Sequence, residues 1–149
     1  MTSTTATTTA TTAALPTTAT AGEPAAQNAL AFGGRVLLAA IFVLSGLAKV
    51  TAPDATIGHI QSAGLPFPQL ALAAAVLTEL GGGLALIAGY RTRLVALLLA
   101  AFSLVTAFAF HNALGDQNQF IHFFKNVAMA GGLLQVAAFG GGRIAFHRN

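Results

Sequence analysis

Long stretches that consist mainly of apolar residues follow one another along this chain. They cover about residues 32–50, 69–89, 94–110 and 120–139. None of them alternates between apolar and polar positions with a period of two, as the strands of a membrane barrel do. A helix rises about 1.5 Å per residue and needs about 20 residues to cross the hydrocarbon layer of a bilayer. The pattern therefore predicts four transmembrane helices.

The composition indicates that lipid, and not water, is the solvent of this chain. Only 7% of its 149 residues are charged and 55% are hydrophobic, whereas about 25% of the residues of an ordinary soluble domain are charged. A soluble protein of this size would lack the polar side chains needed to cover its core. The expected fold is all-α, an integral membrane four-helix bundle formed by residues 31–142.

The arginines predict the orientation of the bundle. Arg35 opens the first span, Arg91 and Arg93 lie between the second and third spans, and Arg143 and Arg148 follow the fourth. With four spans these positions share one side of the membrane, and the positive-inside rule makes that side cytoplasmic. We therefore expect both termini to be cytoplasmic (N-in, C-in). The net charge of +3 follows from this topology, and we expect no nucleic-acid partner.

The two ends of the chain differ from the apolar part. Residues 1–30 are rich in Thr and Ala and have no charge before Glu23, which predicts a disordered cytoplasmic tail. This tail lacks the basic and apolar regions of a secretory signal. Residues 143–149 are expected to form a short basic cytoplasmic tail. The absence of cysteine excludes thiolate metal sites and iron–sulfur ligation. The sequence also has no haem or flavin signature, so no intrinsic cofactor is expected.

Polar side chains gather toward the outer half of the predicted bundle. The candidate pocket residues are Lys49, Glu79, His111, His122, Lys125 and Asn126. A charged side chain at the centre of a membrane helix costs about 3 kcal/mol, so Glu79 must be paired, protonated or next to a wet cavity. Since long side chains can bridge a difference in depth, we expect Lys125 to be the partner of Glu79, with Lys49 above. The alternative is a charge pair that serves only to fix the register of the helices.

Two further patterns bear on this pocket. Pro53 and Asp54 begin a short interfacial helix that ends near Gly64, and this helix is expected to form a lid over the pocket. The glycines at 81–83 and 131–132 lie within spans, where small residues allow helices to approach closely. We do not expect a metal site at His111 and His122, because an adjacent ammonium opposes cation binding.

The ordered set of motifs resembles the DoxX family of small bacterial membrane proteins. The segments that carry the resemblance are GRVLLAAIFVLSGLAKVTAP, GLPFP, TELGGGLALIAGYRTR and FHNALGDQNQFIHFFKNVAMAGGLL, which occur in this order and cover about residues 33–140. The family's motif positions fall on Lys49, Glu79, Arg91, His111, Lys125 and Asn126.

The resemblance implies a function linked to redox biology in the bacterial inner membrane. Named members of the family include a small subunit of a thiosulfate:quinone oxidoreductase and a partner in a membrane complex linked to oxidative stress. We therefore expect an accessory membrane subunit, without catalysis of its own, that binds a quinone or a small anion. Its partners would be the bilayer, other membrane redox subunits or cytoplasmic redox and sulfur enzymes, and a second copy of the chain. The alternatives are a structural assembly protein and a small proton-coupled transporter driven by Glu79.

Overall fold

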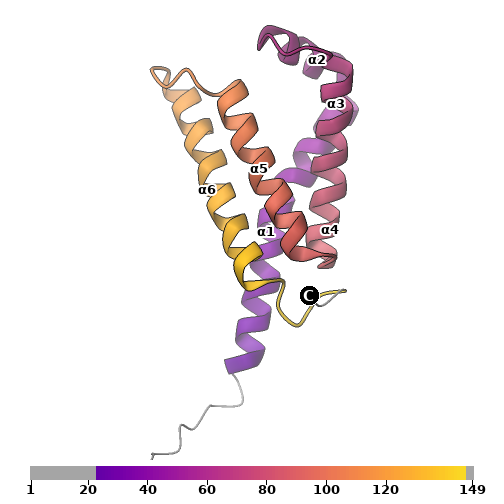
Figure 1. The fold of residues 1–149 in the computed structure, drawn as a ribbon, viewed down its shortest axis with the longest axis vertical. Coiled ribbons are helices and arrows are strands. Elements are labelled where there is room, and N and C mark those ends of the chain that lie inside the picture. The colour runs from indigo at the N-terminus through magenta and orange to yellow at the C-terminus, as the bar shows by residue number, and fades with distance from the viewer. Residues whose placement is uncertain (1–22, 147–149) are drawn as a thin grey trace, which may run out of the picture.

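The computed structural model describes residues 23–146, and this part of the chain is helical, with no strand (Figure 1). The elements in order are α1 (Glu23–Thr51), α2 (Pro53–Ser62), α3 (Pro68–Val76), the π-helical segment η1 (Leu77–Gly81), α4 (Gly82–Ala88), α5 (Thr92–Phe110) and α6 (Gln117–Phe139). The predicted all-α class is confirmed. Residues 1–22, which hold most of the predicted N-terminal tail, and residues 147–149 lie outside the described part.

Within residues 23–146, three helices are long and apolar enough to cross a membrane. They are α1, the continuous helix formed by α3, η1 and α4, and α5. α6 has 23 residues, which is also long enough, but its first half contains several amide, imidazole and ammonium side chains. It lies beside α5 and runs in the opposite direction (Figure 1). The structure therefore offers three candidate membrane spans, and the fourth span stays a prediction.

Two boundaries differ from the prediction. α1 begins at Glu23 and not after residue 30, so the predicted disordered tail is too long. The Ala-rich residues that follow Pro24 favour a helix, and proline is well tolerated in the first helical turn. α6 begins at Gln117, inside the predicted loop, because the Asp116 side chain accepts a hydrogen bond of 2.9 Å from the Gln119 amide and caps the helix.

The short helix expected after the first span is present as α2. It has Pro53 in its first turn and Asp54 near its N-terminus, where a carboxylate interacts favourably with the helix dipole. Gly64 has a φ of +71°, and this left-handed conformation ends the helical stretch two residues after Ser62. Ile60 is buried and turns α2 toward the bundle.

The side chains are distributed as expected for a bundle in lipid. The buried core contains four alanines, three leucines and one phenylalanine, namely Ala39, Phe42, Leu86, Ala96, Leu99, Ala100, Ala130 and Leu133. Large apolar side chains point outward, for example Leu37, Leu77 and Phe108, which are 78%, 75% and 62% exposed. In water such an exposed surface would cause association, whereas acyl chains cover it at no cost.

Glycines determine how closely α1 and α4 approach. A Cβ atom on Gly83 would lie 2.8 Å from Val43 Cγ2, 3.3 Å from the Val43 amide nitrogen and 3.4 Å from the Ala39 carbonyl oxygen. Backbone atoms cannot move aside easily, so only glycine fits at this crossing. Gly132 packs on Leu38, but Gly131 has no atom within 4 Å of its Cβ position. The packing role predicted from the sequence therefore does not apply to Gly131.

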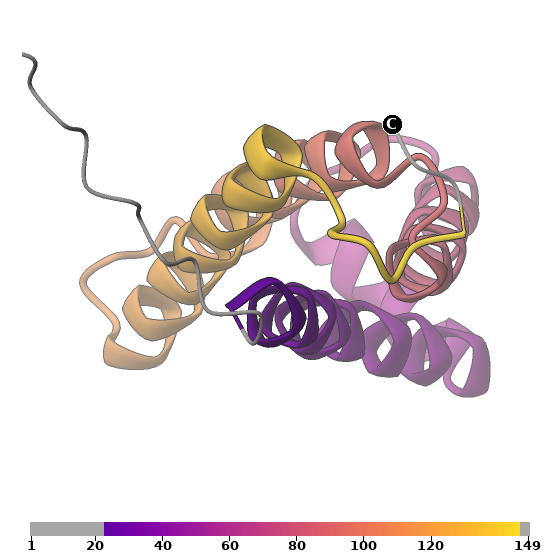
Figure 2. The same cartoon turned by 90° about the horizontal axis from the view of Figure 1, so that it is seen from below.

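The chain folds back on itself after α6. Residues 140–146 cross from the end of α6 toward α4, as the view from below shows (Figure 2). The Phe146 amide donates to the Ala88 carbonyl at 3.0 Å, and the Arg143 amide donates to Asn28 Oδ1 at 2.9 Å. Part of the predicted basic tail is therefore packed against the bundle. These contacts and the apolar core close the end of the bundle at which α4 ends and α5 begins.

Candidate functional site

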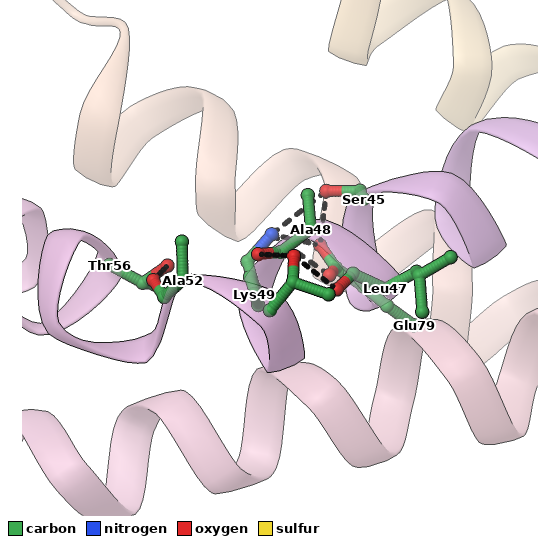
Figure 3. A network of polar contacts seen from close by, with 8 residues as sticks. Ser45, Leu47, Ala48, Lys49, Ala52, Thr56 and Glu79 are labelled. Carbon is green, nitrogen blue, oxygen red and sulfur yellow. Dashed lines mark hydrogen bonds and ion pairs between the residues drawn. The ribbon is translucent and has the colours of Figure 1, made fainter.

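Glu79 forms an ion pair with a lysine in the interior of the bundle. Lys49 Nζ lies 3.0 Å from Glu79 Oε1, to which it donates a hydrogen bond, and 2.9 Å from Oε2 (Figure 3). Oε2 accepts no hydrogen bond, so this second contact is electrostatic. Ser45 joins both groups, because its hydroxyl accepts from Lys49 Nζ at 2.8 Å and donates to Oε1 at 3.2 Å. The Glu79 side chain is 6% exposed and that of Lys49 is 23% exposed.

The local backbone explains this pairing. A Cβ atom on Gly46 would lie 2.7 Å from Leu80 Cγ and 3.1 Å from Glu79 Cβ, so α1 and η1 are in close contact at this glycine. Lys49 and Ser45 are one turn apart on α1 and flank the contact. Glu79 itself lies in the π-helical segment, a feature that often marks functional positions in helices.

The predicted contact between Glu79 and Lys125 is wrong. Lys125 Nζ lies 2.9 Å from His122 Nδ1, one turn earlier on α6, and its side chain is exposed. α6 packs on α5 and α1 but not on η1, so a lysine on α6 does not reach Glu79. Lys49, which was expected to lie above the pair, is the actual partner.

A cavity of about 390 Å³ separates the two lysines. Its walls come from α1, α2, α3, η1, α5 and α6, in the half of the bundle where α2 lies (Figure 1). Five of the six residues proposed from the sequence line it, namely Lys49, Glu79, His111, Lys125 and Asn126. Much of the remaining wall is apolar and includes Phe42, Phe102 and Met129. This volume and this mixture of surfaces are typical of small-molecule sites.

His122 does not line the cavity, but it belongs to a polar cluster at its edge. Its ring stacks on that of His111, with the centroids 5.1 Å apart and an interplanar angle of 27°. His111 Nδ1 in turn lies 2.8 Å from Gln119 Oε1. Asn126 is buried and donates from Nδ2 to the His122 carbonyl at 3.0 Å. The side chains from the end of α5 and the start of α6 therefore form a second polar wall that faces the Lys49–Glu79 pair.

α2 contributes a wall of the cavity that the sequence indicated only as a possible lid. Thr56, His59 and Ile60 line the cavity, and the His59 ring stacks on Phe110 at the end of α5 with the centroids 5.1 Å apart. Neither His59 nor Phe110 was singled out from the sequence. An isolated histidine in a loop helix carries no spacing signal, and the contact depends on how α2 folds back over the bundle.

The charges of the cavity favour an oxygen-bearing or anionic ligand. Lys49 and Glu79 neutralise each other, which leaves the ammonium of Lys125 as an additional positive charge on the wall. Lys49 is still accessible enough for its ammonium to meet a ligand oxygen. Within residues 23–146 no three His, Asp or Glu side chains are grouped closely enough to hold a metal ion.

Comparisons with known proteins agree with this architecture. The DoxX family model matches residues 30–112, from α1 to the end of α5. The chain is 36% identical to the inner membrane protein YqjF of Escherichia coli over 76% of its own length and 86% of that protein. It is 33% identical to the inner membrane protein YphA of the same organism, over 83% and 92% of the two chains. No solved structure matches significantly. The chain belongs to the DoxX family of membrane proteins.

Proposed function

We propose that the cavity binds a small molecule with an apolar body and a carbonyl or anionic group, such as a quinone or a small sulfur oxyanion. The observation that carries this proposal is the placement of Lys49. Its ammonium is held by Glu79 and Ser45, yet it remains partly exposed on the wall of a cavity large enough for a ligand. An ammonium that is held in place loses little side-chain entropy when it donates to a ligand oxygen.

The opposite walls support the same ligand chemistry. Lys125 and Asn126 supply N–H groups across the cavity from Lys49. Phe102 and Met129 provide apolar surface between the two polar walls. A quinone ring has oxygens at opposite ends of a flat apolar body, and it would place one oxygen at each wall.

The chain would act as an accessory subunit of a membrane redox complex. It has no cysteine, which excludes iron–sulfur ligation by its own thiolates. Electrons would therefore reach a quinone bound in the cavity from a partner protein. The relatives YqjF and YphA are described as inner membrane proteins, and we place this chain in the same bacterial membrane.

A second function is favoured by a specific observation. Lys49, Ser45 and Glu79 satisfy one another, as expected of a charge pair that serves only to specify the packing of α1 against η1. Replacing both charged residues together, Lys49→Met with Glu79→Gln, separates the two functions. A purely structural pair predicts that complex formation is kept and that neither the unmodified protein nor the double variant responds to a ligand. A ligand site predicts a response in the unmodified protein that the double variant loses.

Filling the cavity is expected to abolish ligand binding without a change of charge. Ala109 lines the cavity from α5, and Ala109→Phe would place a ring in the space of the ligand. We expect the affinity for a short-chain quinone and for thiosulfate to fall at least tenfold, which corresponds to about 1.4 kcal/mol. The measurement is the ligand-dependent rise of the unfolding temperature of the purified protein.

The matched control is Ala101→Phe, the same substitution on an exposed position of α5 that does not line the cavity. It should retain the response of the unmodified protein. Equal ligand responses in the Ala109 and Ala101 variants would argue against a site in this cavity, as would the lack of a response to either ligand in the unmodified protein.

We also propose that α6 is a fourth span and that both termini are cytoplasmic. α5 and α6 are antiparallel neighbours, and the segment after α6 bonds to Ala88 at the end where α5 begins. If α5 crosses the bilayer, α6 must return across it. Arg91, Arg93 and Arg143 all lie at this end, as the positive-inside rule requires of a cytoplasmic face.

Because the chain has no cysteine, single cysteine substitutions can test this topology without background labelling of native thiols. Cysteines at Arg91 and Arg143 should resist a membrane-impermeant thiol reagent in intact cells. Cysteines at Asp54 and Gly115 should react readily. Labelling of Arg143→Cys together with Gly115→Cys would mean that α6 does not cross the membrane.

A further inference from the structure

A second polar group lies buried at the other end of the bundle, far from the cavity. Arg35 on α1 is 1% exposed, and the only hydrogen bond of its guanidinium within the described residues runs from Nη2 to the Ile144 carbonyl. Its Nε and Nη1 atoms have no hydrogen-bond partner there. The Phe32 ring, 5.6 Å away, contacts the guanidinium but accepts no conventional hydrogen bond. Buried donors without acceptors are rare and call for an explanation.

Thr92, in the first turn of α5, is in the same situation. It is 3% exposed, and its Oγ1 atom has no hydrogen-bond partner within residues 23–146. The unpaired groups of Arg35 and Thr92 converge. Gly141 has no side chain, and the position that a Cβ atom would take on it marks the point where they meet. This position is 3.0 Å from Arg35 Nη1 and 2.7 Å from Thr92 Oγ1. These are ordinary distances between a donor and an acceptor oxygen.

The surroundings of this point are positively charged. Arg91, Arg93 and Arg143 lie at the same end of the bundle. Among the carboxylates of residues 25–146, Asp54 and Asp116 lie at the opposite end, and Glu79 is paired with Lys49. The amides of the first turn of α5 add the positive end of a helix dipole. No hydrogen bond or ion pair joins Arg35 to a carboxylate in the described part of the chain.

We propose that Arg35, Thr92 and the N-terminus of α5 form a binding site for a phosphate group. A phosphate oxygen at the point of convergence would accept from Arg35 Nη1 and Thr92 Oγ1, and the guanidinium suits bidentate binding of phosphate. Gly141, which is part of residues 140–146, lies directly beside this point and leaves no room there for a phosphate. That segment is joined to the rest of the bundle by the amides of Gly140, Arg143 and Phe146 and by the Ile144 carbonyl, and the proposal requires that a bound phosphate displaces it.

The phosphate can come from an anionic phospholipid headgroup or from free phosphate. The site lies at the level of the turn between α4 and α5, where the predicted topology places the lipid headgroups. Native mass spectrometry of the delipidated full-length protein distinguishes the two sources. The probes are phosphatidylglycerol, diacylglycerol with the same acyl chains, and inorganic phosphate.

The unmodified protein should bind phosphatidylglycerol, inorganic phosphate or both, and should not retain diacylglycerol. Arg35→Gln should weaken the phosphate complex by roughly tenfold or more, because it removes charge-assisted hydrogen bonds. Thr92→Val keeps the shape of the side chain and removes the hydroxyl, and it should weaken the complex several-fold. This second variant keeps the test decisive if Arg35→Gln fails to fold.

Arg91→Gln is the matched control, since it removes one positive charge from an exposed position at the same end. Its affinity for phosphate should stay within about twofold of the unmodified value. Binding that falls equally in Arg35→Gln and Arg91→Gln would show a diffuse attraction to the basic surface and would overturn the site. The site would also be overturned if neither phosphatidylglycerol nor inorganic phosphate bound, or if Thr92→Val bound phosphate as strongly as the unmodified protein.

Discussion

Replacing Glu79 by Gln is expected to lower the free energy of unfolding by roughly 2–3 kcal/mol, because it leaves the Lys49 ammonium without its counter-charge. The loss should fall short of the value for a fully buried pair. Lys49 is partly exposed, and once released it can extend toward the interface. Chemical denaturation of the purified protein in mixed micelles measures this change.

Lys125→Gln is the matched control for this prediction. It also removes one charge from the wall of the cavity, but Lys125 contacts His122 and not Glu79. Its effect on the free energy of unfolding should stay below about 1 kcal/mol, as for an exposed polar contact. If Lys125→Gln lowered the free energy of unfolding strongly and Glu79→Gln lowered it only slightly, the ion pair between Lys49 and Glu79 would be contradicted.

Gly83→Ala is expected to destabilise the protein by about 1–3 kcal/mol, because the added methyl group would force α1 away from α4. The atoms in its way include the backbone of Val43 and Ala39, which cannot rotate aside. The close crossing of these helices also positions Gly46, and with it the contact between Lys49 and Glu79. Thermal unfolding should therefore show a lower midpoint, and ligand binding in the cavity should weaken in parallel.

The same run of glycines supplies the control. Gly81 is exposed, and the nearest atom to its Cβ position is Leu77 Cδ1 at 3.8 Å. Gly81→Ala should be neutral, or should stabilise the helix by up to about 1 kcal/mol through its higher helix propensity. If both substitutions had the same effect, close packing at Gly83 would not be the reason for the glycine.

Much of the fold could be predicted because the apolar runs report helix position directly. Residues 69–89 contain one charge among aliphatic side chains, and the structure has a helix there from Pro68 to Ala88. The π-helical turn around Glu79 has no comparable signal, since its residues also favour an ordinary α-helix. It forms where the carboxylate turns toward α1, and that depends on tertiary packing.

The partner of Glu79 was missed for a different reason. Depth along each helix can be counted from the sequence, and both lysines lie within reach of Glu79 by that measure. The order of the helices around the bundle cannot be counted in this way. Gly46 is a small residue one turn before Lys49, but only the structure shows that it brings α1 against η1. Likewise, the sequence places Arg35 near the start of a span, but it does not show that its side chain is buried. That burial depends on the return of residues 140–146 to the bundle.

A double-mutant cycle of Lys49→Met and Glu79→Gln, measured as free energies of unfolding, tests whether Lys49 on α1 is the ion-pair partner of the buried Glu79 carboxylate. Residues in direct contact typically show a coupling of about 0.5–3 kcal/mol. We expect a value in the upper part of this range for Lys49 with Glu79, and less than about 0.5 kcal/mol for the same cycle with Lys125→Met. A coupling near zero for Lys49, with a large one for Lys125, would contradict the arrangement of the cavity described above.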